Sequence, residues 1–146
     1  MTDTILPTVP PVPLPPGRVE VRPFGNQAFT VKMRGHALLT DQPLDTGGDD
    51  NGPTPVELFV VSLAACVAHY AGRFLERHHL DRERLGVTAE FTMADDLPAR
   101  VTNVHLRITV PPELSAARLG ALRAVVDRCT VHNTLRQTPR VTLEFG

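Results

Sequence analysis

Apolar and polar residues alternate along the first part of the chain. Val19 and Val21 alternate with charged residues, and 28–34 alternates again before Gly35 separates it from 36–40. A period of two places the apolar side chains on one face of a strand. The pattern therefore predicts two or three antiparallel strands with a turn near Gly35. The next residues, 45–52, contain three glycines and no apolar residue, and they predict a loop.

A helix signal follows this loop. Thr54 is a capping residue, Pro55 suits the first helical position, and Glu57 completes a capping box with Thr54. Residues 58–71 are apolar almost all round. A helix of this kind is buried on every side, so it is predicted to run through the core. One sheet in so short a chain does not cover such a helix, and a homodimer is therefore expected.

The second half of the chain predicts a strand pair joined by a polar turn, then a helix, a short turn and a closing strand. Their ranges are 85–93, 101–110, 115–128, 130–135 and 141–145. Helices packed against antiparallel sheet give an α+β fold.

The N-terminal residues are rich in proline, with six prolines between positions 7 and 16. Such a stretch is expected to be extended, because proline donates no backbone hydrogen bond. Two interpretations stay open for 1–17, a poorly ordered arm and an arm lying across a partner subunit. The folded domain is predicted over 18–146.

Composition narrows the function classes. Fifteen basic and sixteen acidic side chains give a net charge of −1, which argues against a nucleic-acid partner. Two cysteines are too few for a secreted disulfide scaffold. We expect no membrane association, because no apolar run reaches the roughly 18 residues that a span needs. The first residues also lack the features of a signal peptide, and a cytoplasmic protein is expected.

The two cysteines carry the candidate chemistry. Cys66 is followed three residues later by His69, and Cys129 by His132. Residues three apart share a helix face, so each thiol could meet an imidazole. The pairs permit two buried core thiols, a structural zinc site built from all four residues, or thiol redox chemistry.

Both cysteines lie in motifs that resemble those of the OsmC/Ohr family, the osmotically inducible and organic hydroperoxide resistance proteins. Residues 52–59 (GPTPVELF) and 62–66 (SLAAC) resemble its first cysteine motif, and 129–135 (CTVHNTL) resembles its second. The cysteines are 63 residues apart (129 minus 66), which suits the family. The element order matches from about Arg18 to the C-terminus.

The resemblance implies an OsmC-like fold, with antiparallel sheets packed around a buried central helix in an intertwined homodimer. It also implies a thiol-dependent peroxidase that acts on organic hydroperoxides. Cys66 would be the peroxidatic cysteine and Cys129 the resolving one, passing through a sulfenic acid and a disulfide. A dithiol reductant of the lipoyl or small-thiol kind would restore both thiols. No cofactor and no metal ion are expected.

Two further residues are candidates through the same resemblance. A thiol in apolar surroundings resists ionisation, so an active Cys66 needs a nearby cation. Arg34 is the candidate, because the family uses an arginine from the strands before this helix; alternatively, Arg34 is a solvated hairpin charge.

Glu57 marks a departure from the family pattern. The peroxidase groups carry a glutamate ten residues before the attacking cysteine, where this chain has Val56. Glu57 is on the opposite side of the helix from Cys66, roughly 13 Å along the axis. It either acts across a dimer interface or serves only as a helix cap.

Two other functions remain as alternatives. One is a non-enzymatic thiol sensor or hydrophobic-ligand-binding protein on the same fold. The other is a structural zinc protein that uses Cys66, His69, Cys129 and His132.

Overall fold

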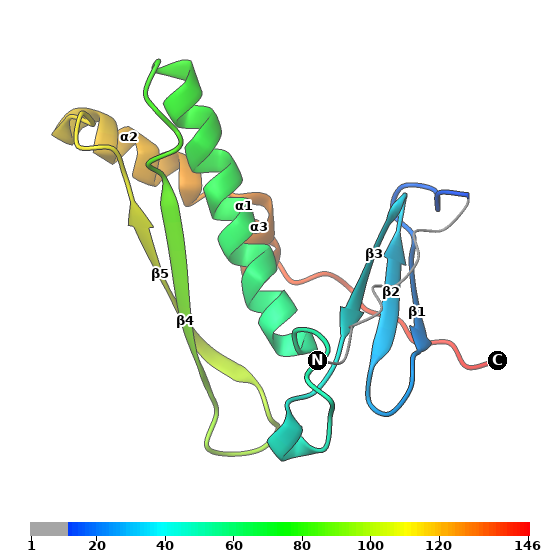
Figure 1. The fold of residues 1–146 in the computed structure, drawn as a ribbon. Coiled ribbons are helices and arrows are strands. Elements are labelled where there is room, and N and C mark those ends of the chain that lie inside the picture. The colour runs from blue at the N-terminus through cyan, green and yellow to red at the C-terminus, as the bar shows by residue number, and fades with distance from the viewer. Residues whose placement is uncertain (1–11) are drawn as a thin grey trace. The chain divides into compact units, whose positions relative to one another are not determined.

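The computed structural model describes residues 12–146, which form two compact units that divide between Leu58 and Phe59. The first unit contains strands β1 (Val19–Pro23), β2 (Phe29–Met33) and β3 (His36–Thr40) and the start of helix α1 (Pro55–Arg77) (Figure 1). The second contains the rest of α1 and then β4 (Gly86–Met93), β5 (Val101–Thr109), α2 (Ala116–Val126) and α3 (Thr130–Arg136). The predicted α+β class is confirmed. Of the proline-rich arm over 1–17, residues 1–11 lie outside the described part of the chain.

The three strands of the first unit form an antiparallel sheet in the order β1-β2-β3. Met33 pairs with His36, so the connection between β2 and β3 is the two-residue turn Arg34-Gly35. Arg34 occupies the left-handed region with φ +48°. The predicted strands and the turn near Gly35 are confirmed.

The loop after β3 is organised by one buried carboxylate. Asp41 Oδ1 accepts a hydrogen bond from the Gln42 N–H at 2.7 Å, and Oδ2 accepts from the N–H groups of Asn51 at 3.0 Å and Asp49 at 3.3 Å. The tight path of the loop also requires glycine, because a Cβ at Gly48 would collide with the Gln42 carbonyl. The sequence predicts the loop, and the structure shows what holds it.

Helix α1 begins as the sequence predicts. The Thr54 Oγ1 accepts a hydrogen bond from the Glu57 N–H at 3.1 Å, and the Glu57 Oε2 accepts one from the Thr54 N–H at 3.2 Å. Two backbone donors that a helix start leaves without partners are thereby satisfied, as in a capping box.

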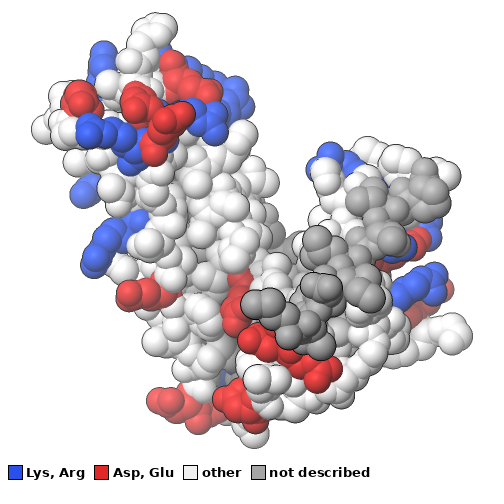
Figure 2. All heavy atoms as spheres, viewed as in Figure 1, with Lys and Arg blue, Asp and Glu red and all other residues white. Residues whose placement is uncertain are grey.

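The burial of α1 is one-sided in the single chain, which differs from the expectation of burial all round. Val67, Ala71 and Leu75 are buried, whereas Phe59 is 38% and Val61 54% exposed. Figure 2 shows a largely uncharged surface over the middle of α1, with charged side chains gathered near its C-terminal end. The helix is apolar on more sides than the elements of one chain cover.

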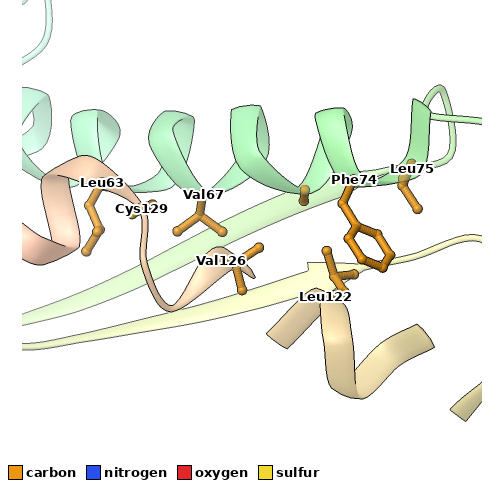
Figure 3. Close-up of a cluster of buried hydrophobic side chains, with 8 residues drawn as sticks. Leu63, Val67, Phe74, Leu75, Leu122, Val126 and Cys129 are labelled. Atoms are coloured by element: carbon orange, nitrogen blue, oxygen red, sulfur yellow. The ribbon is translucent and has the colours of Figure 1, made fainter. Parts of the chain in front are cut away.

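The core of the second unit lies between α1 and the segment that runs from α2 into α3. In Figure 3, side chains from α1 point toward side chains of α2 and toward Cys129. The buried members of this cluster are Leu63, Val67, Ala71, Phe74, Leu75, Leu122, Val126 and Cys129. On its other side, β4 and β5 pair antiparallel and contribute half-buried apolar residues. The predicted strand pair and the helix after it are confirmed.

Two predictions for the C-terminal region are wrong in the single chain. The expected short turn after Cys129 is a helix, α3. The expected closing strand over 141–145 is absent, and residues 138–146 have no regular secondary structure. Val141, Leu143 and Phe145 are 77%, 81% and 91% exposed. A strand forms only when its backbone groups find a partner, and this segment pairs with no strand among the described residues.

The expectation that no segment is long and apolar enough to span a membrane is wrong for α1. By length and composition, Pro55–Arg77 meets that requirement. A core helix of a globular protein has the same properties, and the inward face of α1 is packed against α2 and Cys129. The length and composition of α1 are therefore weak evidence for a membrane span.

Candidate functional site

Cys66 lies in the middle of α1, on the edge of its buried face. The capping box fixes where the helix starts, and helical periodicity then places Cys66 beside the inward positions Leu63 and Val67. The side chain is half-buried and packs against the core cluster. Cys66 is therefore a thiol that has both apolar neighbours and access to solvent.

Cys129 lies at the junction of α2 and α3 and is fully buried. It is the residue before the first turn of α3, with an extended backbone (φ −63°, ψ 146°), and the backbone N–H groups of Val131 and His132 lie on the side of its sulfur. Burial raises the pKa of the Cys129 thiol, and the neighbouring Cys66 raises it further, while the two N–H groups oppose the rise.

The two cysteines are brought together by the fold. Cys66 packs against the buried cluster that contains Cys129 and is close enough to raise the pKa of the Cys129 thiol, and both thiols are free rather than joined in a disulfide. Two adjacent thiols can form a disulfide when one of them is oxidised. Since Cys66 is accessible and Cys129 is not, an oxidant from solvent reaches Cys66 first.

The cysteine motifs do not predict the hydrogen-bonded hydroxyls of Tyr70 and Thr130 near the thiols. Tyr70, one helical turn after Cys66, places its hydroxyl 3.0 Å from the Oγ1 of Thr130, the residue after Cys129. This hydrogen bond joins α1 to α3 at the thiol pair. The four-residue spacing from Cys66 to Tyr70 is a signal in the sequence, but Thr130 carried none.

The histidines that follow the cysteines have different surroundings. The exposed ring of His69 lies edge-on to Tyr70, with the ring centroids 5.9 Å apart. His132 Nδ1 lies 3.9 Å from the Asp127 Oδ1, which also accepts from Arg136 at 2.7 Å. The hydrogen bond from Arg136 is the main cause that lowers the pKa of Asp127.

The four residues of the predicted zinc site do not come together in the structure. Over residues 12–146, no group of three or more His, Cys, Asp or Glu side chains gathers closely enough to hold a metal ion. A structural zinc site uses four ligands in a tetrahedron. Cys66 and Cys129 meet, but His69 and His132 do not complete a set with them.

The other two candidate residues lie before the thiol helix and in its first turn, respectively. Arg34 is exposed at the β2–β3 turn in the first unit, whereas Cys66 belongs to the second. Its role as the cation for Cys66 stays a prediction. Glu57 is engaged in the capping box with Thr54, which is one of the two roles expected for it.

A hollow of about 460 Å³ opens on the second unit next to the thiol region. Its apolar lining comes from α1, β5 and α2, and its polar lining from α2 and α3. The lining residues are Val67, Leu106, Ile108, Arg123, Ala124, Val126, Asp127 and His132. An apolar hollow with a few polar groups is the usual form of a small-molecule site.

The arrangement can be compared with known proteins. The model of the OsmC family, described as OsmC-like protein, matches residues 47–144, which include both cysteines. The chain belongs to the OsmC-like protein family. A search of the curated proteins found no significant match.

Solved structures of OsmC-like proteins share this fold. An osmotic stress induced and detoxification response protein of Psychrobacter arcticus is 27% identical, with 83% of this chain and 89% of the other covered and a TM-score of 0.69. An OsmC-like protein of Mycoplasma pneumoniae is 17% identical, with 85% and 91% covered and a TM-score of 0.65.

A third structure bears on the chemistry of the family. An organic hydroperoxide resistance protein OsmC of Legionella pneumophila, also described as a predicted redox protein, is 19% identical, with 84% and 92% covered and a TM-score of 0.54. At this identity the likeness shows the fold. OsmC-like proteins are soluble and commonly homodimeric, so α1 is a core helix of a soluble fold.

Proposed function

We propose that this OsmC-like protein reduces organic hydroperoxides with Cys66 and Cys129. One observation carries the proposal: the half-exposed Cys66 packs against the cluster that contains the buried Cys129 and lies near enough to raise the pKa of its thiol. This asymmetry suits a two-step cycle, because the first step needs access to substrate and the second needs only a neighbour.

In the first step, the Cys66 thiolate attacks one oxygen of the hydroperoxide and the O–O bond breaks. Cys66 becomes a sulfenic acid, and the leaving alkoxide takes a proton to become an alcohol. The thiol of Cys129 then attacks the sulfenic sulfur, which forms the disulfide and releases water. A dithiol reductant, of the lipoyl or small-thiol kind, exchanges with this disulfide, restores both thiols and is itself oxidised.

The proposal gives Arg34 a role in the reaction and gives Glu57 a structural role only. Arg34 is proposed to stabilise the thiolate of Cys66, because a thiol among apolar neighbours needs a cation to ionise. Glu57 is assigned to the helix cap, where both of its capping-box hydrogen bonds are formed. A catalytic part for Glu57 would require it to leave that position.

A homodimer is part of the same proposal. Three features of the single chain support it: the exposed apolar residues of α1, the two-stranded β4–β5 pair, and the exposed alternating residues over 141–145. A two-stranded sheet is marginal alone, and exposed apolar residues in a row mark an interface. A cytoplasmic location is also proposed, because a cycle that restores free thiols needs a reducing compartment.

The test is turnover of cumene hydroperoxide with dithiothreitol as the dithiol. We expect the wild-type protein to turn over many times and Cys66→Ser to lose that turnover. In the absence of dithiothreitol, Cys129→Ser should consume about one equivalent of peroxide and hold a sulfenic acid that dimedone traps. Arg34→Gln should slow the first step in the same assay, and Arg34→Lys should recover part of the rate.

Other outcomes separate the alternatives. If the disulfide forms stoichiometrically without sustained turnover, the protein is a thiol sensor and the peroxidase proposal fails. If an apolar ligand occupies the 460 Å³ hollow and peroxide is not consumed, it is a binding protein. Equal turnover in wild type and Cys66→Ser would contradict the role of Cys66 directly.

A further inference from the structure

A second groove of the second unit lies between the C-terminal half of α1 and the end of α2. Its volume is about 230 Å³, and its lining divides into two kinds of residue. Tyr70, Phe74 and Val125 provide apolar and aromatic surface; Arg73, Arg77 and Arg128 provide three positive charges. Charged side chains gather near this end of α1 in Figure 2.

The three arginines bring like charges together in the groove. Arg73 and Arg77 are four residues apart on α1 and so lie on one face, where like charges destabilise a helix. Within residues 12–146, no Asp or Glu oxygen lies within 4.0 Å of a guanidinium nitrogen of these three arginines. The nearby Asp127 is paired instead with Arg136 at 2.7 Å. An anion in the groove would relieve the repulsion between the arginines.

The apolar side of the groove is held in place by its neighbours. Phe74 is only 6% exposed, and the His78 ring stacks on it with the centroids 4.1 Å apart. Tyr70 is fixed by its hydrogen bond to Thr130. The groove therefore combines an aromatic surface that is held in place with three cationic groups.

We propose that this groove binds an amphipathic organic anion, that is, a carboxylate or phosphate attached to an aliphatic or aromatic body. The guanidinium groups of Arg73, Arg77 and Arg128 hold the oxygens, since the arginine fork matches both oxyanions. The apolar body lies against Phe74 and Val125. A hollow of 230 Å³ is smaller than the usual site for a whole drug-sized molecule, so it takes the charged end and the adjoining part of the body.

The observations favour a small molecule over an acidic protein. A specific protein partner needs roughly 1,000 Å² of buried surface or more, and this groove is a local feature of six residues. The site goes beyond the peroxidase proposal and does not depend on it, because binding is measured without any hydroperoxide. Arg128 directly precedes Cys129 in the chain, and Tyr70 of the groove hydrogen-bonds to Thr130, the residue after Cys129.

The test uses the full chain in its reduced state, with octanoate and octyl phosphate as probes. Binding is followed by titration calorimetry and by the shifts of backbone amide signals in NMR spectra. We expect saturable binding, with the largest shifts around 70–77 and 125–130 and an affinity that falls as salt is added. The tighter of the two probes identifies the carboxylate or the phosphate as the preferred oxyanion.

Variants and two control probes, one without charge and one without an apolar body, then test the two parts of the site. Arg73→Gln and Arg77→Gln should each weaken binding about three- to tenfold, in line with partly exposed charged contacts, whereas Arg118→Gln on α2 should not. Circular dichroism checks that each variant keeps its helices. Octanol should bind much more weakly than octanoate because it carries no charge. Inorganic phosphate should bind much more weakly than octyl phosphate because it has no apolar chain.

The proposal is overturned if neither probe binds, or if the amide shifts lie elsewhere. It is also overturned if octanol binds as well as octanoate, or if inorganic phosphate binds as well as octyl phosphate. Unchanged affinity in both Arg73→Gln and Arg77→Gln would also overturn the proposal. None of these results bears on whether Cys66 reduces a hydroperoxide.

Discussion

At the scale of single residues, Asp41 shows how one carboxylate can organise a loop. Its side chain is 1% exposed and accepts three backbone hydrogen bonds, from Gln42, Asn51 and Asp49. The hydrogen bond from Asn51 is the largest cause that lowers the pKa of Asp41 below its ordinary 3.8. A group whose pKa is lowered on folding stabilises the native state only while it is ionised.

We expect Asp41→Asn to lower the urea midpoint of unfolding at pH 7, because an amide cannot accept the same three hydrogen bonds. The difference from wild type should be full above the ordinary aspartate pKa of 3.8. It should then close as the pH falls through the lower pKa of the folded state. Urea unfolding of both proteins from pH 7 to pH 2 measures this.

An exposed carboxylate of the same loop is the control. Asp45→Asn should leave the midpoint nearly unchanged, since Asp45 is exposed in the 3₁₀ turn Leu44–Thr46. A difference between wild type and Asp41→Asn that persists unchanged at pH 2 would show that ionisation is not the source of the stabilisation.

The contrast between the two cysteines also belongs to this scale. Both are small and similar in sequence context, with a histidine three residues later. Their difference in exposure arises from position: Cys66 is at the edge of a buried helix face, and Cys129 is between α2 and α3 under that helix. The spacing of residues alone does not reveal that difference.

At the scale of elements, the start of α1 is the feature that the sequence predicts most completely. A capping box is a local motif, in which Thr54 and Glu57 satisfy each other's N–H groups without help from distant residues. Local motifs of this kind form wherever the chain has the right residues at the right spacing. The turn Arg34-Gly35 and the Ser115 cap of α2 are local in the same way.

Thr54→Ala is expected to destabilise the protein by about 0.5 to 2 kcal/mol, the usual cost of losing a helix cap. Glu57→Ala should destabilise it in the same direction. Because each side chain bonds the backbone of the other residue, the double variant should cost less than the two single costs combined. Urea unfolding of the three variants gives these values.

Measuring peroxidase activity in the same variants tests whether Glu57 takes part in the chemistry. If Glu57 is only a cap, Glu57→Ala changes stability and leaves kcat/KM for hydroperoxide near the wild-type value. Ser115→Ala is the matched control, since it removes the cap of α2, where Ser115 Oγ accepts from the Arg118 N–H at 3.3 Å. A large loss of kcat/KM in Glu57→Ala alone would show that Glu57 takes part in the chemistry.

At the scale of the whole molecule, the exposed apolar surface of the single chain predicts its assembly. Phe59 and Val61 on α1 and Phe91 and Met93 on β4 are all more than a third exposed. We expect the wild-type protein to sediment at twice the mass of one chain at micromolar concentration. Burying such residues between two copies removes apolar area from water.

Val61→Lys should weaken this association, because it places a charge on the exposed apolar side of α1. Analytical ultracentrifugation over a dilution series measures the shift toward the single-chain mass. Asp95→Lys, at an exposed position of the β4–β5 turn, should leave the association unchanged. A wild-type protein that sediments as one chain throughout would contradict the homodimer.

The sequence by itself determined the local elements and the family of this protein. Alternation with a period of two predicted the strands of the first unit, and the capping residues predicted the start of α1. The cysteine motifs indicated the family and the candidate thiol chemistry. These features depend on residues that are near one another in the chain, so short-range physics is sufficient to predict them.

Only the tertiary structure decided which distant groups meet. It packed Cys66 against the cluster that contains Cys129, buried the carboxylate of Asp41, and gathered three arginines around one groove. Within residues 12–146 it also left 141–145 without a strand partner, although a closing strand is predicted there. Such contacts depend on how elements pack across long separations in the chain, and no local pattern encodes them.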